Sequence, residues 1–331
     1  MIIRVFAGIA ITSIVVALVG CGREPAKAAK SDKAPPPAVM DPPTQVEPAP
    51  TPAPPIVVAA TDPSTFPGFG PVQLIKPGVK FREATLERGK TPMRIWYYEP
   101  ENAADKLPLV LVPPAGSTLY IGMELSEGDR TEHFPYVEAG FAVASFDIDG
   151  HVPNLQFAGD DAVLQGARAF RDSQAGLANA KAALDFLLAK VPHIDPKRIY
   201  VAGHSSAATL ALLEAEHEPR IKACVAYAPV TDVESYLAQA IPGLERAVPG
   251  MKNFIQISSP KTHADKLKCP VFLFHAQDDG TVPIRHSTDF AAHVKGTNQD
   301  VTLITTAKGG HYISMLREGI PKGIAWLQKR Q

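Results

Sequence analysis

Apolar runs of strand length recur along the chain and alternate with amphipathic segments of helix length. The strand candidates are LPLVLV (107–112), FAVASFDID (141–149), RIYVAGH (198–204), IKACVAYAP (221–229), CPVFLFHAQDD (269–279) and DVTLITTAKGGH (300–311). Apolar positions at helical spacing predict helices at 173–190, 206–217, 284–295 and 313–329. Strands that alternate with helices are typical of a parallel sheet that helices cover on both faces.

An opening hairpin at 79–87 and 93–99 completes a predicted α/β domain with a mostly parallel, eight-stranded sheet. We expect Asp172 or Ser173 to cap the helix at 173–190. The segment 231–268 is longer than an ordinary connection between elements. It therefore predicts a small lid or pocket wall, inserted between strands six and seven.

The first 21 residues differ from the rest of the chain. Arg4 precedes an apolar run from Val5 to Val19 that ends in L-V-G-C, a pattern that resembles a bacterial lipoprotein signal. On this interpretation residues 1–20 are a signal peptide and Cys21 is the lipidated residue. The alternatives are an ordinary cleaved signal and a transmembrane anchor, although about 15 apolar residues are few for a span.

A proline-rich segment follows this leader. Residues 22–71 hold 14 of the 32 prolines of the chain and few large apolar side chains. Such a composition cannot bury a core and favours extended, solvated conformations. We therefore expect a Pro/Ala-rich tether at 21–71 and a single α/β domain at 72–331.

Composition and charge exclude some classes of partner and ligand. The net charge of −1 gives no electrostatic reason to expect a nucleic-acid partner. The histidines and cysteines show no spacing that is typical of metal ligands, and we expect neither a metal nor a cofactor. Cys224 and Cys269 lie in or beside predicted strands, where buried free thiols are favoured over a disulfide.

The segment RIYVAGHSSAATLALL (198–213) contains the strongest signal for chemistry. It reads as a buried strand, a tight turn G-H-S-S-A and a helix that begins with small residues. Gly203 and Ala207, each two residues from Ser205, leave that turn uncrowded. This is the layout of a nucleophile elbow, in which the serine hydroxyl is exposed between strand and helix. Ser205 is therefore predicted to be an acylating nucleophile.

A histidine and a carboxylate lie where such a serine needs them. A serine hydroxyl becomes nucleophilic when a histidine takes its proton, and a carboxylate holds that imidazole in the right tautomer. Asp278 and Asp279 end one predicted strand and His311 follows the next. The carboxyl ends of parallel strands meet at one edge of the sheet, so Ser205 and these side chains are expected to converge there.

The residues around this acid carry a resemblance to a known family. The segment SPKTHADKLKCPVFLFHAQDDGTVPIRHS, followed by G-G-H at 309–311, resembles the prolyl oligopeptidase (S9) and dienelactone-hydrolase-like branch of the α/β-hydrolases, over about residues 75–331. That branch carries H-G-x-x-D-x-x-V-P, which 275–283 matches apart from Ala276. The resemblance implies an α/β-hydrolase fold and places the catalytic acid at Asp279, with Asp278 as the alternative. Gly280 stands where peptidases of this family usually carry an arginine.

The resemblance also implies an oxyanion hole. One donor is expected to be the backbone N–H of Ser206, the residue after the nucleophile. The other comes from the loop after LPLVLV, where Pro113 and Pro114 have no N–H. Ala115 or Gly116 must then supply it.

These features predict a serine hydrolase that forms an acyl-enzyme on an ester or on a peptide or amide bond. An esterase is favoured over a prolyl oligopeptidase-type peptidase, because Gly280 replaces the arginine and no propeller domain fits in the chain. A non-catalytic binding module with the same fold is the alternative from another class. The expected partners are a small acylated or peptide substrate and, through Cys21, a membrane of the bacterial cell envelope, with the outer membrane favoured.

Overall fold

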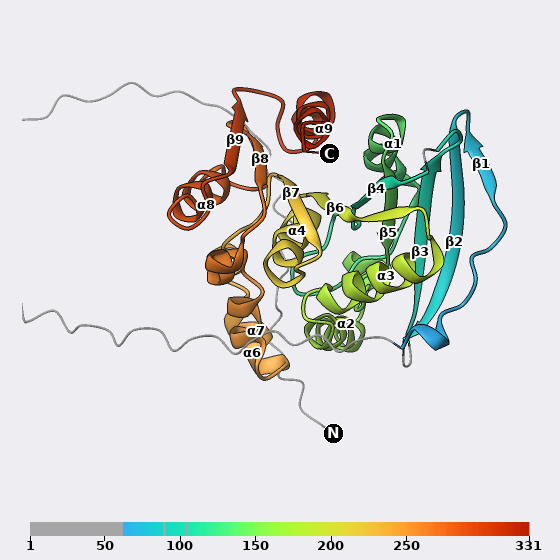
Figure 1. Ribbon diagram of the computed structural model, residues 1–331. Coiled ribbons are helices and arrows are strands. Elements are labelled where there is room, and N and C mark those ends of the chain that lie inside the picture. Colours follow the sequence, from blue (N-terminus) through green and yellow to red (C-terminus); the bar gives the residue numbers. More distant parts are fainter. Residues whose placement is uncertain (1–61, 89–90, 104, 331) are drawn as a thin grey trace, which may run out of the picture. The chain divides into compact units, whose positions relative to one another are not determined.

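The computed structural model describes residues 62–88, 91–103 and 105–330. Its centre is a nine-stranded sheet in the order β1-β2-β3-β5-β4-β6-β7-β8-β9 (Figure 1). The strands are β1 (Gln73–Lys76), β2 (Val79–Arg88), β3 (Thr91–Pro100), β4 (Leu107–Leu111), β5 (Ala142–Phe146), β6 (Ile194–His204), β7 (Ile221–Tyr227), β8 (Val271–Ala276) and β9 (Val301–Thr306). β1, β2 and β3 pair antiparallel, and every pair from β5 to β9 is parallel.

The prediction of eight strands was one strand short. All eight predicted strands are present, and β1 adds a ninth at the edge beside β2. This strand has only four residues, and its first two are exposed. A short segment without an apolar run carries little strand signal, so the sequence did not reveal it.

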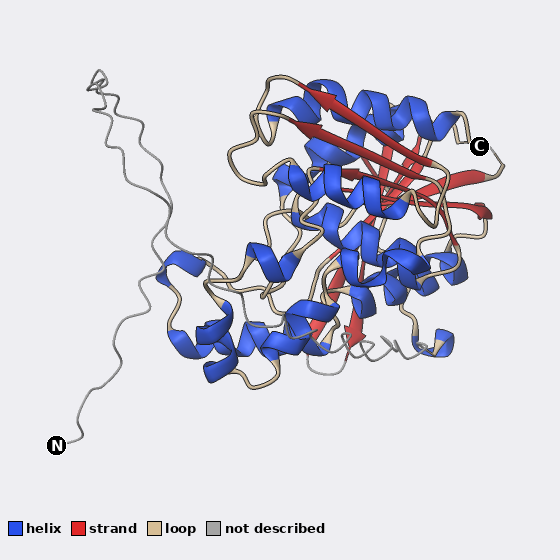
Figure 2. Cartoon of the chain, turned by 90° about the vertical axis from the view of Figure 1, so that its left-hand side faces the viewer, coloured by secondary structure: helices blue, strands red, loops and turns tan. Residues whose placement is uncertain are grey.

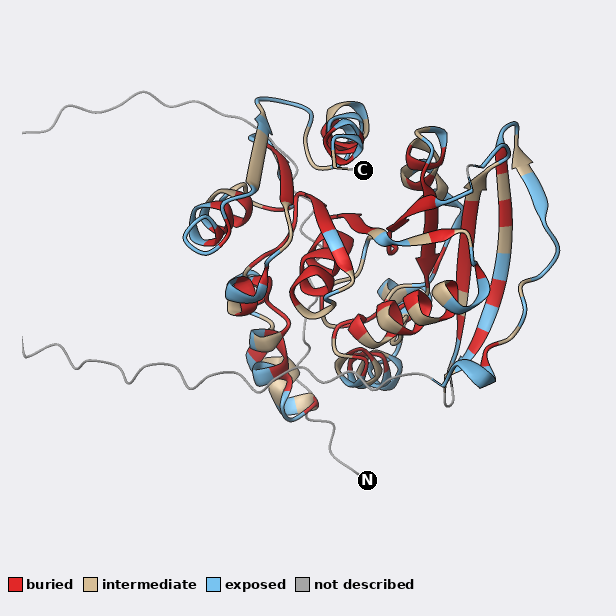
Figure 3. Cartoon of the chain, in the orientation of Figure 1, coloured by how far each residue is buried: buried red, intermediate tan, exposed pale blue. Residues whose placement is uncertain are grey.

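Helices cover both faces of the sheet (Figure 2). The helices of eight or more residues are α1 (Arg130–Glu138), α2 (Asp160–Asp172), α3 (Leu177–Lys190), α4 (Ser206–His217), α8 (Arg285–Val294) and α9 (Ile320–Gln328). In Figure 1, α1 and α9 lie on one side of the sheet and α3 and α4 on the other. Buried residues fill the central strands and nearly the whole of α4 (Figure 3).

Two helix predictions need correction. The helix predicted at 173–190 begins at Leu177 with Gly176 at its N-cap, so neither Asp172 nor Ser173 caps it. Gln174, Ala175 and Gly176 all have positive φ, and this left-handed turn separates α3 from α2. The last predicted helix, 313–329, is divided into a π-helical turn, η5 (Met315–Gly319), and α9.

The predicted insertion is present between β7 and β8, the sixth and seventh of the predicted strands. It consists of α5 (Val233–Tyr236), α6 (Ile241–Ala247), α7 (Met251–Ile257) and a 3-10 segment, η4 (Pro260–Lys266). Thr209 of α4 fixes it to the elbow helix, because its hydroxyl donates to the Val230 carbonyl and accepts from the Val230 N–H. These bonds fix the residue that leads into the insertion, and Phe254 of α7 packs edge-on against Phe170 of α2.

The described residues ahead of 72 take part in the core. A 3-10 turn, η1 (Pro63–Thr65), precedes Phe66, which is 7% exposed and packs edge-on against Phe186 of α3. Phe69 contacts the same ring. The predicted signal peptide at 1–20, Cys21 and residues 22–61 of the predicted tether (21–71) lie outside the described residues.

Other predictions concern membrane spans and cysteines. Within the described ranges, no helix has the length and apolar character that a membrane span requires. Cys224 and Cys269 are free thiols, and burial raises the pKa of Cys224 well above its usual value.

Candidate active site

Ser205 lies on a tight turn between β6 and α4. Its backbone has φ 57° and ψ −121°, a conformation that is costly for a residue with a side chain. A Cβ at Gly203 would come within 2.4 Å of the Ala207 carbonyl oxygen, so the turn closes only with glycine there. The Ser205 N–H donates to the Tyr227 carbonyl of β7 at 2.8 Å, which ties the strained turn to the neighbouring strand.

Asp279 lies in the loop after β8 and is 1% exposed at its side chain. Its Oδ1 accepts the N–H groups of Thr281 at 2.8 Å and Val282 at 2.9 Å, and its Oδ2 lies 2.7 Å from His311 Nδ1. His275 Nε2 is 3.2 Å from the same oxygen. Burial alone would raise the pKa of Asp279, but the hydrogen bonds from His275, His311 and Val282 hold it well below its usual range.

Asp278 forms hydrogen bonds with different partners from those of Asp279. Its two carboxylate oxygens accept the backbone N–H groups of Gly309 at 3.1 Å and Gly310 at 2.8 Å. These glycines, with φ of 122° and 61°, form the turn that leads into His311. The two carboxylates thus share one loop, with Asp279 on the imidazole ring and Asp278 on the backbone that carries it.

His311 is also held from its other side. His204, 4% exposed, lies with its ring centre 4.5 Å from that of His311, and its Nε2 contacts the His311 carbonyl oxygen at 3.1 Å. Within the described part of the chain, no hydrogen bond joins the Ser205 hydroxyl to His311. Such a bond is often long without substrate and shortens when the complex forms.

The loop after β4 faces the start of α4. The N–H groups of Gly116 and Ser117 both donate to Ser206 Oγ at 3.0 Å. Of the two donors expected from this loop, Gly116 is therefore already engaged. The N–H groups of Ala115 and Ser206 have no hydrogen-bond partner among the residues described here. Of the three donors predicted from the sequence, these two amides are therefore the unpaired ones.

Comparison with known proteins agrees with this geometry. Residues 131–329, more than half of the chain, match the prolyl oligopeptidase family, Peptidase_S9. The chain belongs to the prolyl oligopeptidase family. Acetyl esterase Axe7A of Xylanibacter ruminicola is 26% identical over 211 residues, which are 56% of this chain and 46% of that protein. This member of the prolyl oligopeptidase family thus spans about half the length of that curated relative.

Solved structures show the α/β-hydrolase fold of this prolyl oligopeptidase family member. The acylaminoacyl peptidase of Pyrococcus horikoshii superposes with a TM-score of 0.58 at 17% identity, over 77% of this chain and 41% of that one. An acetyl xylan esterase from Paenibacillus sp. R4 superposes with a TM-score of 0.55 at 18% identity, over 78% of this chain and 86% of that one. The fold predicted from the sequence is therefore confirmed.

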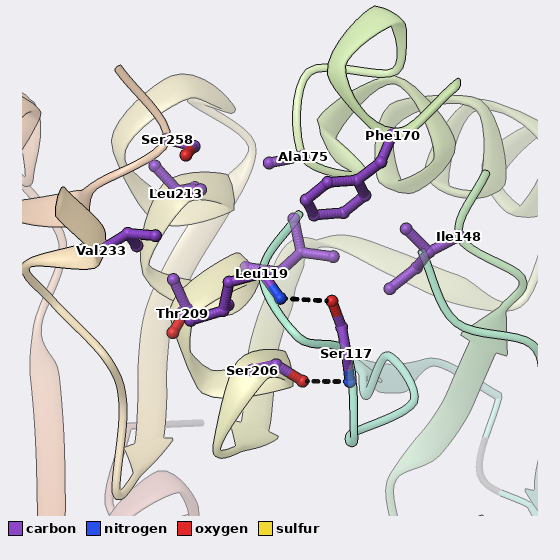
Figure 4. Close-up of a pocket in the computed structure, with 11 residues that line it drawn as sticks. Ser117, Leu119, Ile148, Phe170, Ala175, Ser206, Thr209, Leu213, Val233 and Ser258 are labelled. Carbon is purple, nitrogen blue, oxygen red and sulfur yellow. Dashed lines mark hydrogen bonds between the residues drawn. The ribbon is translucent and has the colours of Figure 1, made fainter. Parts of the chain in front are cut away.

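A small apolar pocket lies beside the elbow of this prolyl oligopeptidase family member (Figure 4). Its volume of about 20 Å³ is enough to admit a water-sized group. α4 and the loop after β4 line it, together with α2, the segment after β5 and the insertion. The side chains drawn from the last three of these parts are Ile148, Phe170, Val233 and Ser258.

The sequence did not predict the contacts that His204, Asp278 and the Ser206 hydroxyl make around the site. His204 packs on the His311 ring and contacts its backbone carbonyl. The hydrogen bonds of Asp278 and of the Ser206 hydroxyl join residues 31 to 90 positions apart, for which the sequence gives no signal. Within the described ranges, no cluster of histidine, cysteine and carboxylate side chains has the arrangement of a metal site.

Proposed function

We propose that this protein is a serine hydrolase that cleaves small esters through an acyl-enzyme on Ser205. The observation that carries the proposal is the 2.7 Å hydrogen bond between buried Asp279 and His311 Nδ1, at the same sheet edge as the strained Ser205. An ionised carboxylate on Nδ1–H leaves Nε2 unprotonated and free to act as a base.

The reaction follows from these groups. Ser205 Oγ attacks the ester carbonyl carbon while its proton passes to His311 Nε2. The N–H groups of Ser206 and Ala115 stabilise the negative charge on the carbonyl oxygen. The tetrahedral intermediate collapses, the C–O bond to the alcohol breaks and His311 protonates the departing oxygen. Water then attacks the acyl-serine by the same route and releases the acid.

A short acyl group is the substrate feature that we favour. The relative Axe7A is named an acetyl esterase, and the pocket that Ser206 lines is small and mostly apolar. We therefore propose acetyl esters, including acetylated carbohydrates, as the substrate class. Membership of the prolyl oligopeptidase family supports a peptidase as the second candidate. Gly280, where those peptidases usually carry an arginine, disfavours it.

Labelling with a fluorophosphonate tests the nucleophile. We expect the intact protein to be modified at one serine, and Ser205→Ala to abolish both labelling and turnover. Absence of labelling in folded wild-type protein would support a non-catalytic binding module. Labelling that persists in Ser205→Ala would place the nucleophile elsewhere.

Matched substrates test the chemistry. We expect turnover of p-nitrophenyl acetate to exceed that of the butyrate and octanoate esters, because the pocket is small. Turnover of an aminoacyl p-nitroanilide in preference to the acetate ester would favour the peptidase.

We also propose that the chain is a lipoprotein of the bacterial cell envelope, anchored through Cys21. The L-V-G-C pattern at 18–21 supports this placement. Metabolic labelling with an alkyne-modified palmitate should mark the wild-type protein in the membrane fraction. Cys21→Ser should remove the label, and equal labelling of both proteins would exclude this anchor.

A further inference from the structure

The Ser206 side chain has a place that the proposed chemistry does not use. It follows the nucleophile directly, is 7% exposed, and accepts two backbone N–H groups of the loop after β4. A serine hydroxyl has two acceptor lone pairs, and Gly116 and Ser117 occupy both. The hydroxyl thus binds the two halves of the expected oxyanion hole to each other.

The geometry of the loop explains why such a contact is needed. Pro113 and Pro114 have no N–H with which to pair to a neighbour, and Gly116 turns the chain with φ 104°. Leu119 also has a positive φ of 69°, which is uncommon for a residue with a branched side chain. A loop with these conformations needs external contacts to hold one shape.

The contacts also determine which amide stays available. Because the Gly116 and Ser117 N–H groups turn toward Ser206 Oγ, neither is free for substrate. Ser117 Oγ accepts the Leu119 N–H (Figure 4). It also donates to the Ile121 carbonyl, which fixes the other end of the loop. The Ala115 N–H is left between these fixed points and the prolines.

We propose that the Ser206 hydroxyl is a positioning residue that holds the Ala115 N–H at the oxyanion hole. The residue therefore acts twice, through its own N–H on the oxyanion and through its side chain on the second donor. This inference rests on the proposed function of Ser205. It predicts that loss of the hydroxyl lowers kcat and leaves KM nearly unchanged. A displaced donor weakens the hydrogen bond to the charge that develops in the transition state more than it weakens the binding of substrate.

The test separates the side chain from the backbone, since every variant at 206 keeps its N–H. Loss of one oxyanion donor costs roughly 100- to 1000-fold in kcat, and we expect displacement of Ala115 in Ser206→Ala to cost about 10- to 100-fold on p-nitrophenyl acetate. KM should stay within about threefold of wild type. Affinity for phenylboronic acid, which forms a tetrahedral adduct on serine, should fall by a factor similar to that of kcat. Ser206→Thr, which retains the hydroxyl, should recover most of both losses.

A matched control lies at the opposite end of the sheet. The Asn298 side chain donates to the carbonyls of Leu267 at 3.0 Å and Cys269 at 2.7 Å, so it is also a buried clamp on two backbone groups. Asn298→Ala should lower the melting temperature with kcat unchanged. A kcat and a boronate affinity within twofold of wild type in Ser206→Ala would overturn the proposal, and so would a loss confined to KM.

Hydrogen exchange keeps the two proposals distinguishable. Exchange of the peptide that spans 113–121 should quicken in Ser206→Ala and not in Ser205→Ala. Unchanged exchange in Ser206→Ala would show that the hydroxyl does not hold the loop, whatever the activity. A wild-type protein with neither labelling nor turnover would instead contradict the proposed function.

Discussion

Asp279 and the two glutamates Glu214 and Glu216 of α4 are buried carboxyl groups with opposite properties. Asp279 is surrounded by donors, which include His275 and His311, and its pKa is lowered. Within the described chain, both oxygens of Glu216 and Oε1 of Glu214 have no hydrogen-bond partner. Burial, without such partners, raises the pKa of both glutamates well above the usual value. Hydrogen bonds, and not burial, thus determine which buried carboxyl stays charged.

The difference follows from where each group lies. Asp279 is in a turn at the carboxyl end of β8, where backbone N–H groups are not consumed by the sheet and can point at its side chain. Glu214 and Glu216 lie within α4, whose N–H groups are used in helical bonds. The carboxyl group with the lowered pKa therefore lies in a loop, and the two with a raised pKa lie within a helix.

The largest effect is expected from Asp279→Asn. The asparagine carbonyl can still accept the Thr281 and Val282 N–H groups, but its amide would face His311 Nδ1 and favour the wrong tautomer. The corresponding change in a Ser-His-Asp triad lowers kcat about 10⁴-fold, and we expect a similar loss in ester turnover. Glu214→Gln is the matched control and should leave kcat unchanged. An equal loss in both variants would mean that kcat reports fold stability.

A smaller effect is expected from Asp278→Ala. This change removes the acceptor of the Gly309 and Gly310 N–H groups and loosens the turn ahead of His311, while the Asp279–His311 bond stays. We expect kcat to fall about tenfold, since positioning losses are smaller than loss of the acid. A loss in kcat larger than that of Asp279→Asn would mean that Asp278, and not Asp279, is the catalytic acid.

The smallest effect is expected from Glu216→Gln, which should stabilise the protein. The pKa of Glu216 is raised in the folded protein, whereas the pKa of a glutamate in the unfolded chain is about 4.3. As pH rises above that value the unfolded state loses its proton first, so the free energy of unfolding falls. Glu216→Gln removes this penalty, and we expect it to raise the free energy of unfolding by about 1–3 kcal/mol at pH 8 and by less at pH 5.

Urea unfolding at the two pH values measures this gain. Glu218 ends the same helix but is paired with Arg220 at 2.6 Å, so Glu218→Gln should lower stability. A gain from Glu216→Gln that is equal at pH 5 and pH 8 would contradict the link to ionisation.

The fold and the place of the candidate residues could be predicted because both depend on local patterns. Apolar runs gave the eight long strands, and the small residues Gly203 and Ala207 identified the turn at Ser205. Asp279 and His311 follow consecutive strands, and parallel strands bring such ends together. Their hydrogen bond is what that order leads one to expect.

What the sequence could not supply depends on contacts between distant segments. Asp278 and Asp279 are adjacent, and only the three-dimensional course of the loop directs one to backbone and the other to a ring. The bonds of Ser206 to the loop after β4 span about 90 positions and involve backbone N–H groups, which every residue except proline has. α2 was not among the helices predicted from the sequence.

Phe66 gives the amino-terminal end of the described chain a mechanical role. Its ring is wedged edge-on against Phe186, and Phe69 packs on the same side chain. Tension applied at this end of the described chain would meet these rings first, and through Phe69 it would reach α3 and Tyr97 of β3 together. Both contacts lie on elements that carry none of Ser205, Asp279 and His311, which follow β6, β8 and β9.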